Sequence, residues 1–218
     1  LPCDPSELTY FRRRIGEDGV RKIFEVSVTL HGDKAKEEDV VVDTTVQEKN
    51  ITFPTDTKLL TKIVTRCHIM AKLEDVKLRR SYRREVKKLL RIIRFKSKGR
   101  KQGEAQRAVR RLRTIAGVLL RDMRRKLSPE ALEIHRQSLD LYDRVQRQQR
   151  SDTGKIYSLH EPDVSCISKG KAHKKYEFGA KASVTVTKTS GIIVGALSFS
   201  DNPFDGHTLP AVLTQVES

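Results

Sequence analysis

Asp43 is the residue whose type and position could most directly support chemistry. It follows three valines and precedes Thr44-Thr45-Val46, in a run that begins at Asp39. A short β-branched run between acids predicts a strand covered on both faces, and covered strands are usually central in a mixed or parallel sheet. A carboxylate at the end of such a strand can hold a metal ion. Asp43 is therefore a candidate catalytic and metal-binding residue, the alternative being an Asp that opens a turn.

The charge of the chain indicates its partner. The formal net charge is +16 over 218 residues. Residues 61–150 hold 28 Lys and Arg against 9 Asp and Glu, a local net charge of +19, so the rest of the chain sums to −3. Such an excess in one segment favours nucleic acid over a small-molecule substrate. The aromatic content of 6%, with no Trp, favours duplex over single-stranded bases.

The remaining composition predicts a cytoplasmic protein without membrane contact. No apolar run approaches the roughly 20 residues that span a bilayer, and no signal peptide precedes the first expected element. Cys3, Cys67 and Cys166 lack CxxC or zinc-like spacing, so we expect reduced thiols, with a zinc site as the alternative. Because the chain opens on Leu1 and closes on Ser218 within an expected helix, we treat it as a fragment.

Helical periodicity dominates residues 56–149. Apolar residues recur at helical spacing before and after a glycine-containing break at residues 97–103, which predicts antiparallel helices. Ser128-Pro129 predicts the start of the last helix, since Ser can cap and Pro is tolerated at the first helical position. The expected buried stripes are Leu60, Ile63, Val64, Cys67 and Met70; Tyr82, Val86, Leu89, Leu90 and Ile93; Ala105, Ala108, Leu112, Ile115, Leu119 and Met123; and Leu132, His135, Leu139, Tyr142 and Val145.

The two ends of the chain have different patterns. Near the N-terminus we expect a short helix capped by Ser6 and ending at Gly16, and we expect residues 18–31 to continue as a helix, with an apolar spacing that also fits a strand. After residue 154 the pattern changes to strands. Residues 176–187 and 192–199 predict a hairpin around Thr189-Ser190-Gly191, and a helix is expected from His207.

Several sequence blocks, in this order, resemble DDE transposases of bacterial insertion sequences, of the insertion-sequence-five type and its relatives. The blocks are distributed over nearly the whole chain, and any one of them alone would be weak. The blocks are Asp4-Pro5-Ser6-Glu7-Leu8 with Phe11-Arg12-Arg13-Arg14-Ile15-Gly16, Val41-Val42-Asp43-Thr44-Thr45-Val46, Asn50-Ile51-Thr52-Phe53-Pro54-Thr55-Asp56, the lysine-rich residues 169–181, and Asn202-Pro203-Phe204-Asp205-Gly206-His207-Thr208-Leu209.

The resemblance implies an α/β (α+β) fold. Its core would be a partial ribonuclease H-like sheet, in which a first strand with an acidic end lies beside an antiparallel hairpin. A long, basic, all-helical insertion would separate the first and second strands. The implied organisation is a lead-in segment (1–38), a partial catalytic domain (39–55 and 155–218) and a helical insertion arm (56–154).

The resemblance also implies an enzyme that moves DNA by metal-dependent phosphodiester cleavage and strand transfer. Asp43 would be the first of three acids that hold two Mg²⁺ (or Mn²⁺) ions, which activate the attacking oxygen and stabilise the leaving one. The second and third acids belong on elements after the last expected helix, so we expect no activity from this fragment. Asp201 and Asp205 lie too early to replace them, and we interpret them as turn and capping residues.

The implied partner is double-stranded DNA, as transposon ends and as target, and the helical arm would grip that DNA or a second protomer in a homodimer. The alternative function is a non-catalytic, basic helical nucleic-acid-binding module in which Asp43 is structural. Solvated basic faces are the alternative for the arm. The candidate DNA-binding residues are Arg79, Arg80, Arg83, Arg84, Lys87, Lys88, Lys171, Lys174 and Lys181.

Overall fold

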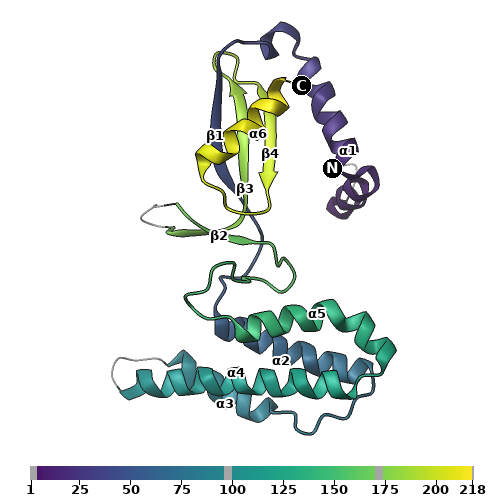
Figure 1. Cartoon of the computed structure of the whole chain (residues 1–218), viewed down its shortest axis with the longest axis vertical. Coiled ribbons are helices and arrows are strands. Elements are labelled where there is room, and N and C mark those ends of the chain that lie inside the picture. The colour runs from purple at the N-terminus through teal and green to yellow at the C-terminus, as the bar shows by residue number, and fades with distance from the viewer. Residues whose placement is uncertain (1–3, 96–99, 170–173, 218) are drawn as a thin grey trace. The chain divides into compact units, whose positions relative to one another are not determined.

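The computed structural model describes residues 4–95, 100–169 and 174–217. In these residues the chain is a mixed α+β protein with six α-helices and a four-stranded antiparallel sheet (Figure 1). It divides into two compact units, which we call the sheet unit (1–47 and 180–218) and the helical unit (48–179). The helical unit extends beyond the expected 56–154 arm at both ends.

Four helices form the core of the helical unit: α2 (Asp56–Leu73), α3 (Arg83–Arg94), α4 (Arg100–Lys126) and α5 (Pro129–Arg147). Their starts follow local capping chemistry. The Thr55 hydroxyl accepts a hydrogen bond from the Lys58 N–H (3.2 Å), and the Ser128 hydroxyl accepts one from the Ala131 N–H (3.2 Å). The Ser128-Pro129 prediction is thereby confirmed.

The helices meet along the predicted apolar stripes, with α4 contacting α2, α3 and α5. The α2 stripe is buried throughout, as is the α4 stripe from Ala105 to Met123. Leu139, Tyr142 and Val145 of α5 are also buried, whereas α3 contributes only Val86 as a fully buried residue. The helical unit is therefore held mainly by apolar burial around α4.

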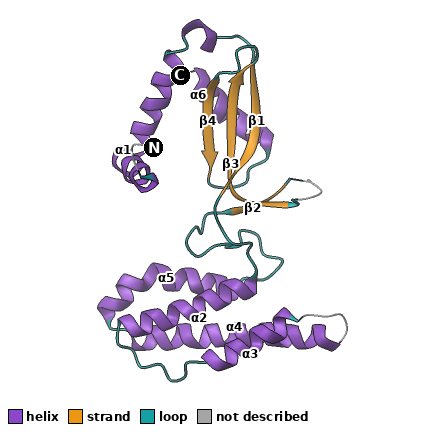
Figure 2. Ribbon diagram, turned by 180° about the vertical axis from the view of Figure 1, so that it is seen from behind, coloured by secondary structure: helices purple, strands orange, loops and turns teal. Residues whose placement is uncertain are grey.

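The sheet contains β1 (Val40–Glu48), β2 (Ser165–Ser168), β3 (Tyr176–Thr187) and β4 (Ile193–Phe199). β3 pairs with all three others, and the β3–β4 hairpin agrees with the prediction (Figure 2). β2, which was not predicted, pairs with the first four residues of β3.

Three predictions about the Asp43 strand are wrong. β1 lies at an edge of the sheet beside β3 rather than at its centre, and Asp43 is the fourth of nine strand residues rather than the last. The strand is also covered on one face only. Val41, Asp43 and Thr45 are exposed, whereas alternate residues are more buried. A run of valines reports β propensity, but whether both faces are covered depends on elements elsewhere in the chain.

Helix α6 (Asp205–Glu217) covers one face of the sheet, and this face is unusually polar. Ser183 and Thr185 of β3 are fully buried there, and the Ser183 hydroxyl donates to the Thr208 hydroxyl of α6 (3.3 Å). Close approach requires a glycine in β4. A Cβ on Gly195 would lie 2.9 Å from Val216 Cγ2 and 3.1 Å from Thr185 Oγ1. Small side chains therefore set how closely α6 packs.

The N-terminal segment is helical from Pro5 to Thr29 (α1), followed by a 3₁₀ turn at Gly32–Ala35. Gly16 interrupts α1 with a left-handed φ of 66°, as its predicted helix-ending role requires. The cap differs from the prediction, because the Asp4 carboxylate accepts the Ser6 N–H (2.9 Å) and Ser6 lies inside the helix. Residues 18–29 are helical, which confirms the helix expected for most of residues 18–31.

Two further findings concern membrane contact and the thiols. In the part of the chain that the structure describes, no helix combines the length and apolarity needed to cross a membrane. Cys67 and Cys166 are free thiols, and Cys3 lies outside the described residues. Burial raises the pKa of the Cys67 thiol to about 12, so Cys67 belongs to the apolar core.

The α4 core predicts a large effect of truncating Leu112, which is fully buried. Leu112→Ala should lower the free energy of unfolding by about 2–5 kcal/mol, because it removes apolar contacts and leaves a cavity. Leu73→Ala is the matched control, since Leu73 is 73% exposed, and it should change stability by about 0.5 kcal/mol or less. Denaturant unfolding of the two variants measures both, and equal effects would contradict this core assignment.

Candidate nucleic-acid interface

Helix α3 presents a strongly basic outer side. Arg83, Arg84, Lys87 and Lys88 are all exposed, and none makes an ion pair with another described residue. We call these four residues the α3 surface. Their spacing spreads cations over more than a turn of helix, while Val86 on the opposite side is buried against the bundle. Unpaired cations on a rigid helix are suited to contacting phosphates.

Arg79 and Arg80, the two candidate DNA-binding residues that precede α3, have partners within the protein. The backbone N–H of Arg79 donates to Asp122 Oδ2 (3.3 Å), although its side chain is exposed. Arg80 Nη2 lies 3.2 Å from Glu85 Oε2, and its guanidinium lies 4.9 Å from the centre of the Tyr82 ring. Such a cation–π contact holds the side chain near the start of α3. Arg80 is therefore less available to a ligand than the α3 surface.

Glu85 joins α3 to α4. Its Oε1 accepts a hydrogen bond from Arg111 Nε (2.7 Å), and this bond holds the pKa of the Glu85 carboxyl below its ordinary value. The carboxylate thus bridges Arg111 on one side and Arg80 on the other. It fixes α3 against the helix that organises the bundle.

Asp122 anchors the loop that precedes α3. Its side chain is only 5% exposed, and Lys126 Nζ lies 3.2 Å from its Oδ2. Lys126 also donates to the Lys77 carbonyl oxygen (2.7 Å). Burial alone would raise the pKa of the Asp122 carboxyl, but hydrogen bonds from the Arg79 N–H and Lys126 outweigh burial and lower it. Residues 77–79 are therefore bound to α4 by a buried, ionised carboxylate.

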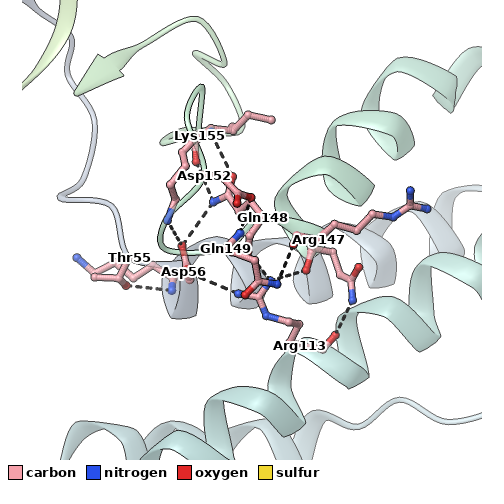
Figure 3. Close-up of polar contacts among 11 residues, drawn as sticks. Thr55, Asp56, Arg113, Arg147, Gln148, Gln149, Asp152 and Lys155 are labelled. Carbon is pink, nitrogen blue, oxygen red and sulfur yellow. Dashed lines mark hydrogen bonds and ion pairs between the residues drawn. The ribbon is translucent and has the colours of Figure 1, made fainter. Parts of the chain in front are cut away.

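A second polar network closes the opposite end of the bundle, around Asp56 at the start of α2 (Figure 3). Arg113 of α4 and Lys155 of the loop after α5 each lie 3.5 Å from the Asp56 carboxylate. Gln148 is buried, accepts the Ile156 N–H (3.1 Å) and donates to the Ile156 carbonyl (3.2 Å). Since all its members are engaged with one another, we assign this network to stability.

The three lysines predicted to bind DNA differ in what the structure shows of them. Lys171 lies outside the described residues. Lys174 is half-exposed and forms an ion pair with Glu48. Lys181 is buried, and its Nζ donates to the Pro203 carbonyl (2.6 Å) and to Asp205 Oδ1 (2.5 Å) at the start of α6. This placement corrects the expectation of a DNA contact at Lys181, because its charge is used to hold α6.

Asp43 lies on the face of the sheet opposite α6. Hydrogen bonds from the Lys49 N–H to the Phe178 carbonyl and from the Lys188 N–H to the Asp39 carbonyl define one antiparallel register of β1 on β3. That register places Asp43 opposite Val184. Its carboxylate is exposed, and the described residues contain no group of three or more His, Cys, Asp or Glu side chains that could hold a metal ion. Asp43 alone does not make a metal site.

Sequence reasoning missed the acids that position α3, Asp122 and Glu85. A weak signal was present. Asp122 precedes Arg125 and Lys126 by three and four residues, the spacing at which opposite charges meet on one helix face. Its burial and its bond to the Arg79 backbone depend on a segment 43 positions away, which local spacing cannot indicate.

The lowered pKa predicts how Asp122 contributes to stability. An ionised Asp122 stabilises the fold above its unfolded pKa of about 4, and this contribution disappears as pH falls through the lower folded pKa. Asp122→Asn should lower the free energy of unfolding at pH 7 by roughly 1–3 kcal/mol, because it removes the buried negative charge and replaces one of the two acceptor oxygens with an NH₂ donor. The variant should also lose less stability than the parent between about pH 5 and about pH 2.

Denaturant unfolding across that pH range tests this expectation. Glu104→Gln is the control, since Glu104 is an exposed acid on the same helix. Coincident stability profiles for Asp122→Asn and Glu104→Gln would show that the Asp122 carboxylate does not anchor the loop.

Comparison with curated proteins finds a partial match. An uncharacterized protein, ORF8 in the nfe locus of Rhizobium meliloti, is 39% identical over 92 residues, which are 40% of this chain and 44% of that protein. The chain thus matches less than half the length of this relative. No family model and no solved structure matches the chain.

Proposed function

We propose that this chain is part of a DNA transposase, with a helical unit that binds duplex DNA and a sheet that carries the first catalytic acid. The observation that carries the proposal is the arrangement around Asp43. Its strand lies beside β3 of an antiparallel hairpin, and a basic helical segment separates β1 from β3 in the chain. The transposase resemblance implies this same order.

The outer edge of β1 supports the proposal further. Within the described residues β1 pairs with no strand other than β3, so no strand lies along its other edge. The edge at β4 differs, because Gln215 of α6 exchanges hydrogen bonds with the Ala196 N–H (2.9 Å) and carbonyl (3.2 Å). A further strand added beside β1 could bring a second carboxylate close to Asp43. The exposed side chain of Asp43 would be accessible to that carboxylate and to DNA.

The helical unit supports DNA binding independently of Asp43. Its α3 surface carries four exposed cations, and the carboxylates of Glu85 and Asp122 fix α3 and its loop. A rigid array of cations releases counterions from DNA and gives affinity without reading sequence. Duplex DNA is thus the proposed partner, and a homodimer is compatible with it.

A non-catalytic nucleic-acid-binding module is the second candidate. It is favoured by one observation, the absence of a three-acid or mixed metal-binding group in the described residues. In that case Asp43 would be an exposed strand residue without chemistry, and the α3 surface would carry the whole function.

Duplex binding by the purified chain tests the function of the α3 surface. The variant Arg84→Gln, Lys87→Gln, Lys88→Gln should weaken binding and reduce the slope of log affinity against log salt by about two to three, since each lost phosphate contact reduces it by about 0.9. Its control, Lys62→Gln, Arg66→Gln, Lys72→Gln, removes the same residue types from exposed positions on α2. Fluorescence anisotropy from about 50 to about 200 mM salt measures both slopes. If the two variants have equal slopes of log affinity against log salt, the loss of binding is due to net charge alone and not to the α3 surface.

A second experiment separates the two candidate functions. In the full-length protein, with the further carboxylates in place, Asp43→Asn should lower Mg²⁺-dependent strand cleavage by at least about 10³-fold, because a metal-binding acid contributes several kcal/mol. Duplex affinity should not change. The control is Asp39→Asn, an exposed acid near the same strand that pairs with Lys188. Equal cleavage by the two variants would favour the non-catalytic module.

A further inference from the structure

An open groove of about 600 Å³ lies between α4 and α5, and no residue of the α3 surface lines it. Four arginines line it, Arg121 and Arg124 from α4 and Arg144 and Arg147 from α5. Each pair is spaced three residues apart, which places both members on one face of their helix. We call this feature the α4–α5 groove.

The four arginines differ in how they are neutralised. Arg124 donates from Nε to Asp143 (3.0 Å) and from Nη2 to Asp143 and Asp140 (both 2.7 Å), so it joins the two helices. The other three, Arg121, Arg144 and Arg147, are exposed and form no ion pair with any described residue. In Figure 3 the Arg147 side chain extends away from the polar network around Asp56. The groove therefore has more positive than negative charge.

The floor of the groove contains a glycine in the middle of a helix. Gly117 lies on α4, where glycine costs roughly 1 kcal/mol relative to alanine. A Cβ at this position would lie 2.9 Å from Gln146 Nε2 and 3.3 Å from Arg121 Nη1. Gly117 therefore leaves room for the Gln146 amide and the Arg121 guanidinium in the groove.

We propose that the α4–α5 groove binds a backbone phosphate of the nucleic acid held by the helical unit. Guanidinium groups present paired N–H donors that match phosphate oxygens, and three such groups without carboxylate partners converge here. A bound phosphate offsets their mutual repulsion. The inference rests on the proposed function for the identity of the ligand, and it adds a contact surface beyond α3.

An acidic protein segment is the competing ligand, and two observations favour phosphate. Arg124 already binds two carboxylates of the protein itself, those of Asp140 and Asp143. The guanidinium groups of the other three arginines line the open groove and form no ion pair with any described carboxylate. The lining is also poor in apolar side chains, which a protein partner would need for burial.

The variant Arg121→Gln, Arg144→Gln, Arg147→Gln tests this groove in the purified chain. We expect duplex affinity to fall at least about tenfold near 0.1 M salt and the salt slope to fall by about two to three. The α2 variant Lys62→Gln, Arg66→Gln, Lys72→Gln is the charge control. A third variant, Arg121→Lys, Arg144→Lys, Arg147→Lys, keeps the charges and should retain most of the slope while losing affinity, because lysine lacks the forked donors.

The outcomes separate this inference from the proposed function. If the groove variant binds like the α2 control while the α3 variant is impaired, the groove inference is wrong and DNA binding by the helical unit stands. If the parent chain does not bind duplex at all, the proposed function fails with it. Tighter binding of inorganic phosphate than of duplex would identify a small-anion site and overturn the backbone assignment, as would binding of an acidic peptide with duplex affinity unchanged.

A measurement on the unmodified chain covers the case in which a variant fails to fold. The Nε–Hε NMR signals of Arg121, Arg144 and Arg147 should shift when a short duplex is added, while that of Arg136, an exposed arginine paired with Glu133, should not. Unchanged signals for the three groove arginines at saturating duplex would overturn the inference.

Discussion

The helical unit can fold only if other interactions outweigh the repulsion between its many basic side chains. Residues 61–150 carry 28 basic and 9 acidic side chains, yet they fold into closely packed helices. Apolar burial along α4 supplies the main driving force, since the apolar stripe of this helix from Ala105 to Met123 is buried and α4 contacts the other three helices of the unit. Five of the nine carboxylates lie at contacts between helices or with the loop before α3.

Five acids of this segment illustrate that distribution. Glu85 joins α3 to α4, Asp122 joins α4 to the loop before α3, and Asp140 and Asp143 join α5 to Arg124 of α4. Glu74 at the end of α2 lies 2.8 Å from the His135 imidazole of α5. Because these five carboxylates are engaged at contacts between elements of the bundle, many of the basic side chains on its outer sides have no acidic partner among the described residues. The same distribution that stabilises the bundle thus leaves unpaired positive charge on its outer sides, which the proposed binding of a polyanion requires.

Much of the helical unit follows from local sequence, whereas the candidate sites do not. The stripe from Leu60 to Met70 and the Ser128-Pro129 start are local features, so periodicity and capping predict them. The edge position of β1 depends on pairing with β3 more than 120 residues later in the chain, and Lys181 is buried only because α6 brings Asp205 to it. β2 spans four residues and is defined by its pairing with β3. A run of valines indicates β propensity and a run of lysines indicates local charge, but whether these residues are buried depends on elements far away in the sequence.

The two faces of the sheet differ: one packs against α6, and the other carries the proposed catalytic acid. The face under α6 buries Ser183, Thr185 and Thr208, small polar residues that permit close packing but could not easily accommodate a metal and DNA. Asp43 lies on the other face, where a carboxylate keeps its hydration and meets no burial penalty. Its strand also has the open edge of the sheet. A catalytic acid needs both access to a phosphate and a neighbouring carboxylate, and among the described strands β1 alone combines an exposed acid in mid-strand with an edge that another strand could join.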